Sequence, residues 1–206
     1  MPAREGYETH GRISTVKRYR VSTGAEDAAQ RTTYNYDTAV NGWGRVASVV
    51  TGQGYTEAFE YSTGGLVTKK SLTAPGALRA LAAVFGYDNE GKRTSLKYPD
   101  LTNDAGDVAF TGKTVTSGFD SFGRPVSLND GTDVVRNGAW SLAGQLTGME
   151  VRNGAVYEAR TWTYNALGQL TGQTATGVNL EYTYPAVNDG RLLKRKDNIS
   201  GEEVAY

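Results

Sequence analysis

The stretch Trp162-Thr163-Tyr164-Asn165-Ala166-Leu167-Gly168-Gln169-Leu170 contains the pattern that decides the fold. Two aromatic residues at alternate positions precede an Asn, and a Gly follows three residues after the Asn. An Asn or Asp that opens a loop accepts a hydrogen bond from its own backbone two residues on, and the Gly takes the positive φ that closes a type I turn with a bulge. The stretch therefore predicts a β-hairpin.

The residues around this turn alternate with a period of two. Trp162 and Tyr164 point to one face and Thr161 and Thr163 to the other. After the turn, Leu170 returns to the aromatic face, while Gln169 and Thr171 face outwards. Such alternation is typical of an antiparallel sheet with one face buried.

Eight copies of the pattern follow one another along the 206 residues. Their glycines stand at 11, 44, 65, 91, 123, 144, 168 and 190, so the spacings are 33, 21, 26, 32, 21, 24 and 22. A period near 22 recurs, and the longer intervals indicate loop insertions. The motif residues are, copy by copy, Tyr7, Gly11 and Arg12; Tyr34, Tyr36, Asp37, Gly44 and Arg45; Phe59, Tyr61 and Gly65; Phe85, Tyr87, Asp88 and Gly91; Phe119, Asp120, Gly123 and Arg124; Trp140 and Gly144; Trp162, Tyr164, Asn165 and Gly168; Tyr182, Tyr184, Gly190 and Arg191.

The repeats predict an all-β fold of tandem antiparallel hairpins. One hairpin is not stable alone, so each must pair with its neighbours. About sixteen strands exceed what an open twisted sheet holds, and we expect a curved or spiralling sheet. In the second copy, Tyr34, Tyr36, Val46 and Val50 are predicted to share one face. No linker divides the chain, so residues 1–206 are expected to form a single array.

Two stretches between motifs are less regular. Residues 73–84 are rich in Ala and Leu and fit a short helix or the strand that leads into Phe85; the strand is favoured. Residues 100–112 are predicted to form a long surface loop. The last residue, Tyr206, fits the first aromatic of a ninth copy, whose Gly would fall at 212, so the chain is expected to stop inside a repeat.

Tyr36-Asp37, Tyr87-Asp88 with Gly91, Gly123-Arg124, and Tyr164-Asn165 with Gly168-Gln169-Leu170 resemble the YD repeats of RHS proteins, shared by toxin-complex C subunits and teneurins. The resemblance covers essentially the whole chain. It implies a strip of β-strands that spirals into a hollow shell, often around a C-terminal toxin or effector domain. Eight copies are fewer than such shells contain, and neither the paired-Asp self-cleaving end of some members nor a toxin domain has a counterpart here.

Composition limits the possible partners and chemistry. Lys plus Arg and Asp plus Glu both number 22, and a net charge of zero argues against nucleic acid or an anionic membrane as the main partner. With no cysteine, disulfides, zinc ribbons and thiol nucleophiles are excluded. No apolar run is long enough to span a bilayer, and the first residues hold no signal core. Secretion or display at the cell surface is expected from the resemblance, with any signal outside this chain.

Several candidate sites have simpler structural interpretations. Arg12, Arg45, Arg124 and Arg191 share the position after the turn Gly and are expected to pack on a motif aromatic or pair with a turn carboxylate, though a ligand-binding ladder is the alternative. The aromatics are expected to pack in the core, with a sugar-binding strip as the alternative. The only histidine, His10, is expected to be a solvated loop residue. Asp100, Asp104 and Asp107, and Asp130 with Asp133, resemble loose calcium ligand sets but fit turn-forming acids better.

The sequence thus predicts a structural scaffold: a piece of a shell that encapsulates an effector or of a cell-surface array. No catalytic, cofactor-binding or metal site is expected. The expected partners are neighbouring repeats or copies of the chain, joined through edge strands. The alternative is a carbohydrate- or protein-binding adhesion module. A propeller glycosidase is disfavoured, because its blades need about 40 residues each.

Overall fold

The computed structural model describes residues 3–103, 105–187 and 189–206, and within them the chain is built of β-strands with one turn of 3₁₀ helix at Ala28–Gln30. The all-β prediction is confirmed. The chain divides into two compact units, residues 1–114 and 115–206. The single array over 1–206 stays a prediction. In the described part of the chain, no helix is both long and apolar enough to span a bilayer.

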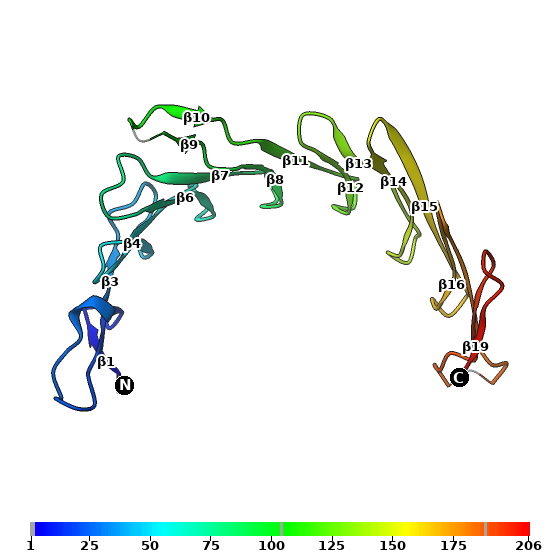
Figure 1. Ribbon diagram of the computed structural model, residues 1–206, viewed down its shortest axis with the longest axis horizontal. Coiled ribbons are helices and arrows are strands. Elements are labelled where there is room, and N and C mark those ends of the chain that lie inside the picture. Colours follow the sequence, from blue (N-terminus) through cyan, green and yellow to red (C-terminus); the bar gives the residue numbers. More distant parts are fainter. Residues whose placement is uncertain (1–2, 104, 188) are drawn as a thin grey trace. The chain divides into compact units, whose positions relative to one another are not determined.

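Unit 1 is an antiparallel meander in which each strand pairs with the next along the chain, from β1 to β8 (Figure 1). Its strands are β1 (Ala3–Tyr7), β2 (Ile13–Arg18), β3 (Thr32–Tyr36), β4 (Val46–Thr51), β5 (Thr56–Tyr61), β6 (Val67–Thr73), β7 (Leu81–Tyr87) and β8 (Arg93–Lys97), followed by a separate two-stranded ribbon of β9 (Leu101–Thr102) and β10 (Val108–Phe110).

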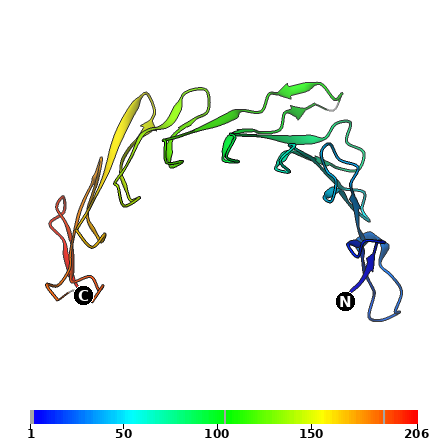
Figure 2. The ribbon, with the colours of Figure 1, turned by 180° about the vertical axis from the view of Figure 1, so that it is seen from behind.

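Unit 2 repeats the meander from β11 to β19, as the view from behind also shows (Figure 2). Its strands are β11 (Thr114–Phe119), β12 (Pro125–Asn129), β13 (Asp133–Trp140), β14 (Leu146–Asn153), β15 (Val156–Tyr164), β16 (Leu170–Ala175), β17 (Val178–Thr183), β18 (Lys194–Asp197) and β19 (Glu203–Ala205). The eight motif copies form the hairpins β1/β2, β3/β4, β5/β6, β7/β8, β11/β12, β13/β14, β15/β16 and β17/β18.

Six of the eight motif turns share one backbone geometry, and the turns closed by Gly44 and Gly190 have longer loops. In the turn of Asp88, its N–H donates to the carbonyl of Lys92 and the N–H of Gly91 donates back to the carbonyl of Asp88, at 3.0 and 3.1 Å. Asp88 Oδ1 also accepts the N–H groups of Glu90 and Lys92, which is the expected Asx-turn. All eight motif glycines have φ between 75° and 89°, as the turn type requires.

A bulge in the strands changes which residues share a face. In the second copy, Tyr36 pairs with Val46 but Tyr34 pairs with Val49, because the register shifts by one residue between Asn35 and Tyr36. Val50 pairs with Thr33 instead, so its predicted place on the face of Tyr34 is wrong. The same shift occurs in each of the first seven motif hairpins, beside the aromatic that directly precedes the turn. We call this residue the second aromatic, also in copies that have no other. Residues two and five positions after the Gly therefore line the aromatic face.

The irregular stretches of unit 1 differ in outcome. Residues 81–84 belong to strand β7, so the favoured interpretation is confirmed for them, whereas residues 74–80 form a connection between β6 and β7. The loop predicted over 100–112 is wrong in part, because the chain there forms the ribbon of β9 and β10. The two strands of this ribbon are joined by a turn with the same geometry as the motif turns. In it, Asn103 Oδ1 accepts the N–H groups of Ala105 and Asp107, and Gly106 has φ 85°.

The aromatic face is less covered than alternation predicted. Among the described residues, Ala47 and Tyr61 are the only buried hydrophobic ones, and the other motif aromatics are half-buried or, like Tyr7, exposed. Each unit is a single sheet layer in which a side chain is covered by its neighbours on the same face but by no second layer. The prediction of a buried face therefore holds only in part for this chain.

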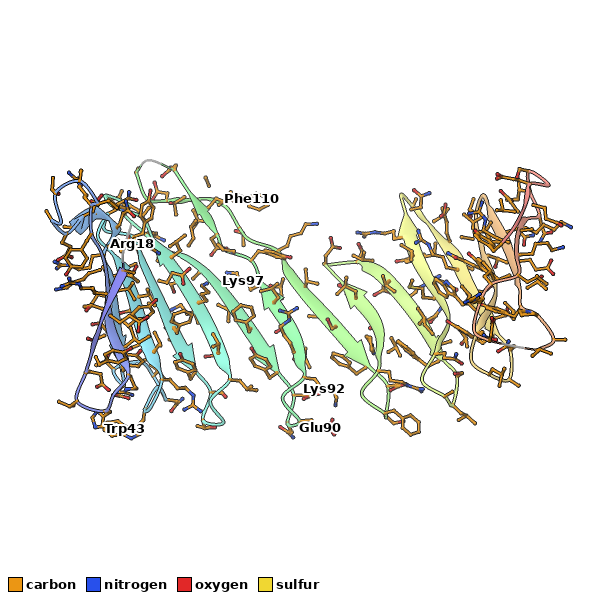
Figure 3. All side chains as sticks on the ribbon, turned by 90° about the horizontal axis from the view of Figure 1, so that it is seen from below. Arg18, Trp43, Glu90, Lys92, Lys97 and Phe110 are labelled. Atoms are coloured by element: carbon orange, nitrogen blue, oxygen red, sulfur yellow. The ribbon has the colours of Figure 1, made fainter. Side chains whose placement is uncertain are left out.

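The two ends of the strands have different roles. Trp43 and Glu90, from two motif turns, lie at one edge of unit 1, and Arg18 and Phe110 lie at the other (Figure 3). We call the first the turn edge, formed in unit 1 by the turns closed by Gly11, Gly44, Gly65 and Gly91, and in unit 2 by those closed by Gly123, Gly144, Gly168 and Gly190. The opposite end holds the long connections 19–31 and 74–80 and the β9–β10 ribbon.

Replacing Gly144 by Ala is expected to destabilise unit 2 by about 1–2 kcal/mol, because φ there is 79° and no atom lies within 4 Å of the added methyl group, so that only backbone conformation is changed. Urea unfolding followed by circular dichroism measures the difference. The control is Gly148→Ala in β14, which has an ordinary φ and room for a methyl group. Equal effects of the two changes would contradict the role of the turn conformation.

Candidate functional site

The turn edge is held together by hydrogen bonds from the second motif aromatic of one hairpin to the backbone of the hairpin before it. The acceptor is always the carbonyl of the residue two positions after the preceding motif Gly. The bonds are Tyr36 Oη to Ile13 O (2.7 Å), Tyr61 Oη to Val46 O (2.6 Å), Tyr87 Oη to Val67 O (2.9 Å), Trp140 Nε1 to Pro125 O (3.0 Å) and Tyr164 Oη to Leu146 O (2.9 Å).

These bonds begin where the backbone pairing between hairpins ends. Strands β6 and β7 pair no further towards the turn edge than Lys69 with Val84, so the carbonyl of Val67 lies beyond the ladder. The hydroxyl of Tyr87 takes the place of the missing N–H. A carbonyl left without a donor at a half-buried position destabilises a fold. The Tyr87 side chain thus continues the hydrogen bonding between the two hairpins beyond the end of the backbone ladder.

The residue directly after the Gly forms a second link to the next hairpin. Arg124 Nη1 donates to the carbonyl of Ser141 at 2.9 Å, and Gln145 Nε2 donates to the carbonyl of Gly168 at 2.7 Å. The guanidinium of Arg124 also lies 5.8 Å from the ring centroid of Trp140, and that of Arg45 lies 5.6 Å from Tyr61. Contact with a motif aromatic is therefore confirmed for these arginines.

The strongest charge cluster is in the first two turns of unit 1. Arg12 bonds both carboxylate oxygens of Asp37 (3.0 and 2.6 Å) and both of Glu8 (2.8 and 3.1 Å), while its guanidinium lies 4.3 Å from the ring centroid of Tyr36. The hydrogen bonds from Arg12 lower the pKa of Glu8 to about 2 and also lower the pKa of Asp37. The same bonds raise the pKa of Arg12. The predicted pairing with a turn carboxylate is confirmed here.

The other predicted site residues are engaged locally or open to solvent. The side chain of His10 is 73% exposed, beside Glu8 at 3.2 Å, and borders a shallow hollow with Trp43 and Arg12. Arg191 is 89% exposed and lies 3.6 Å from Asp189. Burial would raise the pKa of Asp120, but hydrogen bonds from the backbone and guanidinium of Arg124 and from the N–H of Phe122 hold it below its ordinary value.

Three of the acids considered as calcium ligands are occupied by hydrogen bonds or ion pairs. Asp100 accepts the N–H of Gly112 and pairs with Lys97, Asp130 pairs with Arg152 at 3.1 Å, and Asp133 accepts Asn129 Nδ2 at 2.8 Å. Asp104 lies outside the described residues. Within residues 3–103, 105–187 and 189–206, no group of three acids or histidines is arranged to hold a metal ion.

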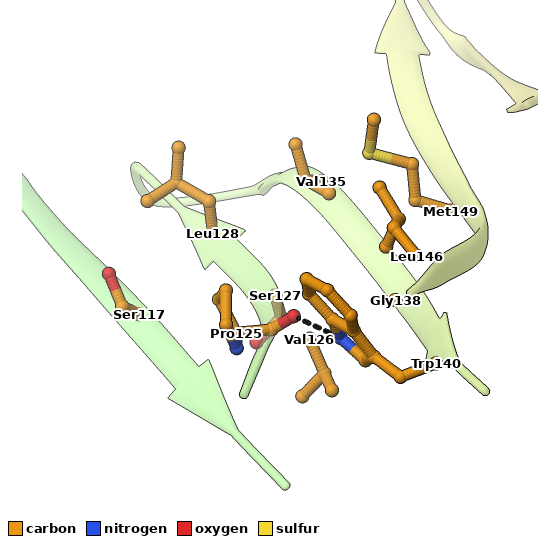
Figure 4. Close-up of a pocket in the computed structure, with 10 residues that line it drawn as sticks. All are labelled: Ser117, Pro125, Val126, Ser127, Leu128, Val135, Gly138, Trp140, Leu146 and Met149. Atoms are coloured by element: carbon orange, nitrogen blue, oxygen red, sulfur yellow. Dashed lines mark hydrogen bonds between the residues drawn. The ribbon is translucent and has the colours of Figure 1, made fainter. Parts of the chain in front are cut away.

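An apolar hollow of about 360 Å³ opens on the aromatic face of unit 2 (Figure 4). Trp140 forms one wall, and Leu128, Leu146 and Met149 line it from positions two or five residues after a motif Gly. Beside the hollow the backbones of β12 and β13 approach closely at Gly138, where an added Cβ would lie 2.7 Å from the Cα of Val126. None of its lining residues is titratable, so it offers surface for contact and no groups for acid–base chemistry.

Sequence reasoning missed a row of small residues on the polar face. The residue before the second aromatic pairs with the residue four after the Gly, as in Gly86 with Ser95 and Gly118 with Ser127. The Ser hydroxyl lies 2.3 Å from where a Cβ of either glycine would be. The signal was present, because Gly or Ala stands in this pair in five copies: Gly6, Gly86, Gly118, Ala139 with Gly148, and Gly172.

Comparison with solved structures identifies this arrangement. A complex entitled TcdB2-TccC3-TEV matches over 98% of this chain at 18% identity, with a TM-score of 0.54, and one entitled TcdB2-TccC3-Cdc42 matches over 98% at 18% identity, with a TM-score of 0.50. The fold is RHS-like. This chain spans 11% and 13% of those matched chains. No protein-family model matches the sequence, and no curated protein does.

Within the RHS-like fold, each repeat position has a definable mechanical task. The Gly turns the chain, the residue after it contacts the next turn, and the second aromatic supplies the missing donor. The contacts with the next turn and the donated hydrogen bond join one repeat to its neighbour. They use the motif aromatics and the Arg or Gln after the Gly, which are the side chains that a ligand-binding strip would need.

The change Tyr87→Phe removes only a hydroxyl and is expected to destabilise unit 1 by about 1 kcal/mol, because the carbonyl of Val67 loses its donor. Urea unfolding is the measurement. The control is Tyr55→Phe in the same unit, where the ring is 43% exposed. If both changes have the same effect, the bond between hairpins contributes nothing.

The Glu8–Arg12–Asp37 cluster predicts acid sensitivity. Both carboxylates have a lowered pKa, so their contribution is complete above their ordinary pKa values of 4.5 for Glu8 and 3.8 for Asp37 and is lost as the pH falls towards 2. We expect the urea midpoint to fall over that range. The double change Glu8→Gln and Asp37→Asn should reduce this fall and lower stability at neutral pH. An unchanged pH profile in the double variant would contradict the assignment.

Proposed function

We propose that this chain is a structural scaffold segment, a stretch of wall built from paired hairpins. The observation that carries the proposal is the hydrogen bond from the second aromatic to the preceding hairpin, which recurs in five copies, at Tyr36, Tyr61, Tyr87, Trp140 and Tyr164. A group that recurs in copy after copy with the same partner suits architecture, since a binding or catalytic site is built once.

A structural role is also favoured over catalysis by the state of the charged groups. Arg12 is held by two carboxylates and Arg124 by Asp120 and a backbone carbonyl. The apolar hollow beside Trp140 lacks titratable groups. We therefore propose that the chain is not an enzyme.

In a longer protein, this wall would enclose a toxin or effector domain or form part of a secreted or cell-surface array. The proposal draws on the RHS-like fold and on the toxin complexes that share it. The half-covered aromatic face supports it, because a sheet with one apolar face needs further protein to cover that face.

We also propose that the wall grows through its strand edges. The N–H of Tyr206 donates to Leu193 and that of Asp197 to Glu202, so the alternate N–H groups of Glu203 and Ala205 point away from β18. Such free donors on an edge strand pair readily with another strand.

Light scattering coupled to size-exclusion chromatography over a range of concentrations tests the scaffold role. The mass is expected to grow with concentration. Ala205→Pro removes one outward N–H without breaking the ladder to β18, so it should reduce growth, while Ala205→Ser keeps the N–H and should not. A single monomer mass at every concentration would overturn the proposed self-association.

A further inference from the structure

The turn edge of unit 2 carries a row of exposed apolar side chains. Phe122, Leu142 and Leu167 lie at the tips of three consecutive motif turns and are 77%, 105% and 72% exposed. We call these three residues the apolar tip row. Single exposed apolar residues are common, but one at each of three successive turns is a patch that needs a partner.

The charges around the row are balanced. Asp120 and Arg124 form an ion pair at 2.7 Å, and the equivalent positions in the next two turns are Ser141 with Gln145 and Asn165 with Gln169. The residue directly before the motif Gly is Phe122, Ala143 or Leu167 in these three turns, with Leu142 one position earlier, and His10, Trp43, Gly64 or Glu90 in unit 1. An uncharged partner therefore fits the tips of these three turns.

The spacing of the row favours one partner in particular. Successive tips are two strands apart, which is about 10 Å at the usual strand separation. Between Phe122 and Leu142 lies a hollow of about 300 Å³, lined also by Arg124, Ala143 and Gly144. Along this edge, apolar side chains protrude at regular intervals with a hollow between the first two. A second row with the same spacing is complementary to it in shape.

We propose that the apolar tip rows of two copies of this chain mesh in opposite directions about a two-fold axis. The Leu142 side chain of each copy fills the hollow between Phe122 and Leu142 of the other. The Leu142 side chains of the two copies are then adjacent in the shared row, about 5 Å apart along it, which is half the distance between successive tips of one copy. The contact is small, so the association is weak and reversible. The inference rests on the proposed scaffold role and assigns its self-association to the turn edge in addition to the strand edge.

The sharpest test uses a single cysteine, since the natural chain has none. In the full chain, Leu142→Cys is expected to form a disulfide-linked dimer on mild oxidation, because a disulfide needs Cα atoms within about 7 Å. The matched control is Val156→Cys, a similarly apolar and exposed position at the opposite end of the strands, 60% exposed. Equal dimer yields for the two variants would overturn the proposal.

A second measurement separates the turn edge from the strand edge. The triple variant Phe122→Ser, Leu142→Ser, Leu167→Ser should raise the dimer dissociation constant at least tenfold in sedimentation equilibrium. The matched triple variant Val21→Ser, Val156→Ser, Ile199→Ser, which changes exposed residues at the opposite end, should leave it unchanged. Circular dichroism confirms that both variants fold.

The remaining outcomes are distinguishable. If Ala205→Pro abolishes association and the tip variant does not, the scaffold role stands and the turn-edge contact is overturned. If the natural chain is a monomer throughout, both fail. If the tip residues are needed for binding to phosphatidylcholine vesicles and not for dimerisation, the row serves a lipid surface and the proposal is overturned.

Discussion

The hydrogen bond from an aromatic tip to a carbonyl of the preceding hairpin is the interaction on which the repeat depends. A motif turn places its bulge beside the second aromatic, and the backbone ladder to the neighbouring hairpin stops short of the turn. Without a side chain that reaches back, every hairpin would leave a carbonyl unpaired at the same place. A Tyr, or a Trp through its indole N–H, supplies both the apolar surface of the sheet and this donor.

The same geometry explains why the pattern could be found in the sequence. The turn needs Gly for its positive φ, an Asx or Ser residue three positions before it, and an aromatic before that, and all three requirements are local. The hairpins, the strand leading into Phe85 and the packing of arginines on aromatics were therefore predictable. The turn of Asn103 and Gly106 has the same chemistry, but no aromatic precedes it, so the sequence pattern does not predict it.

What the sequence could not provide depends on register and on neighbours. Strict alternation placed Val50 beside Tyr34, but one bulge residue moves Val49 there. Alternation also indicated a buried face, yet coverage is a property of whatever packs on the sheet, and Ala47 and Tyr61 are the only buried hydrophobic residues in the described part of the chain. The acceptors of the aromatic tips are backbone groups, which every residue has, so no pattern of side chains identifies them.

The two ends of the strands differ in whether they can accept longer connections. The hydrogen bonds of the second aromatics lie at the turn edge, whereas the connections 19–31 and 74–80 and the β9–β10 ribbon extend from the other end. Loop length adds only a small entropic term, about 0.6 kcal/mol for each doubling. Foreign peptides, binding epitopes or whole domains inserted into the connections 19–31 and 74–80 would be displayed beside the sheet without disturbing the hydrogen bonds at the turn edge.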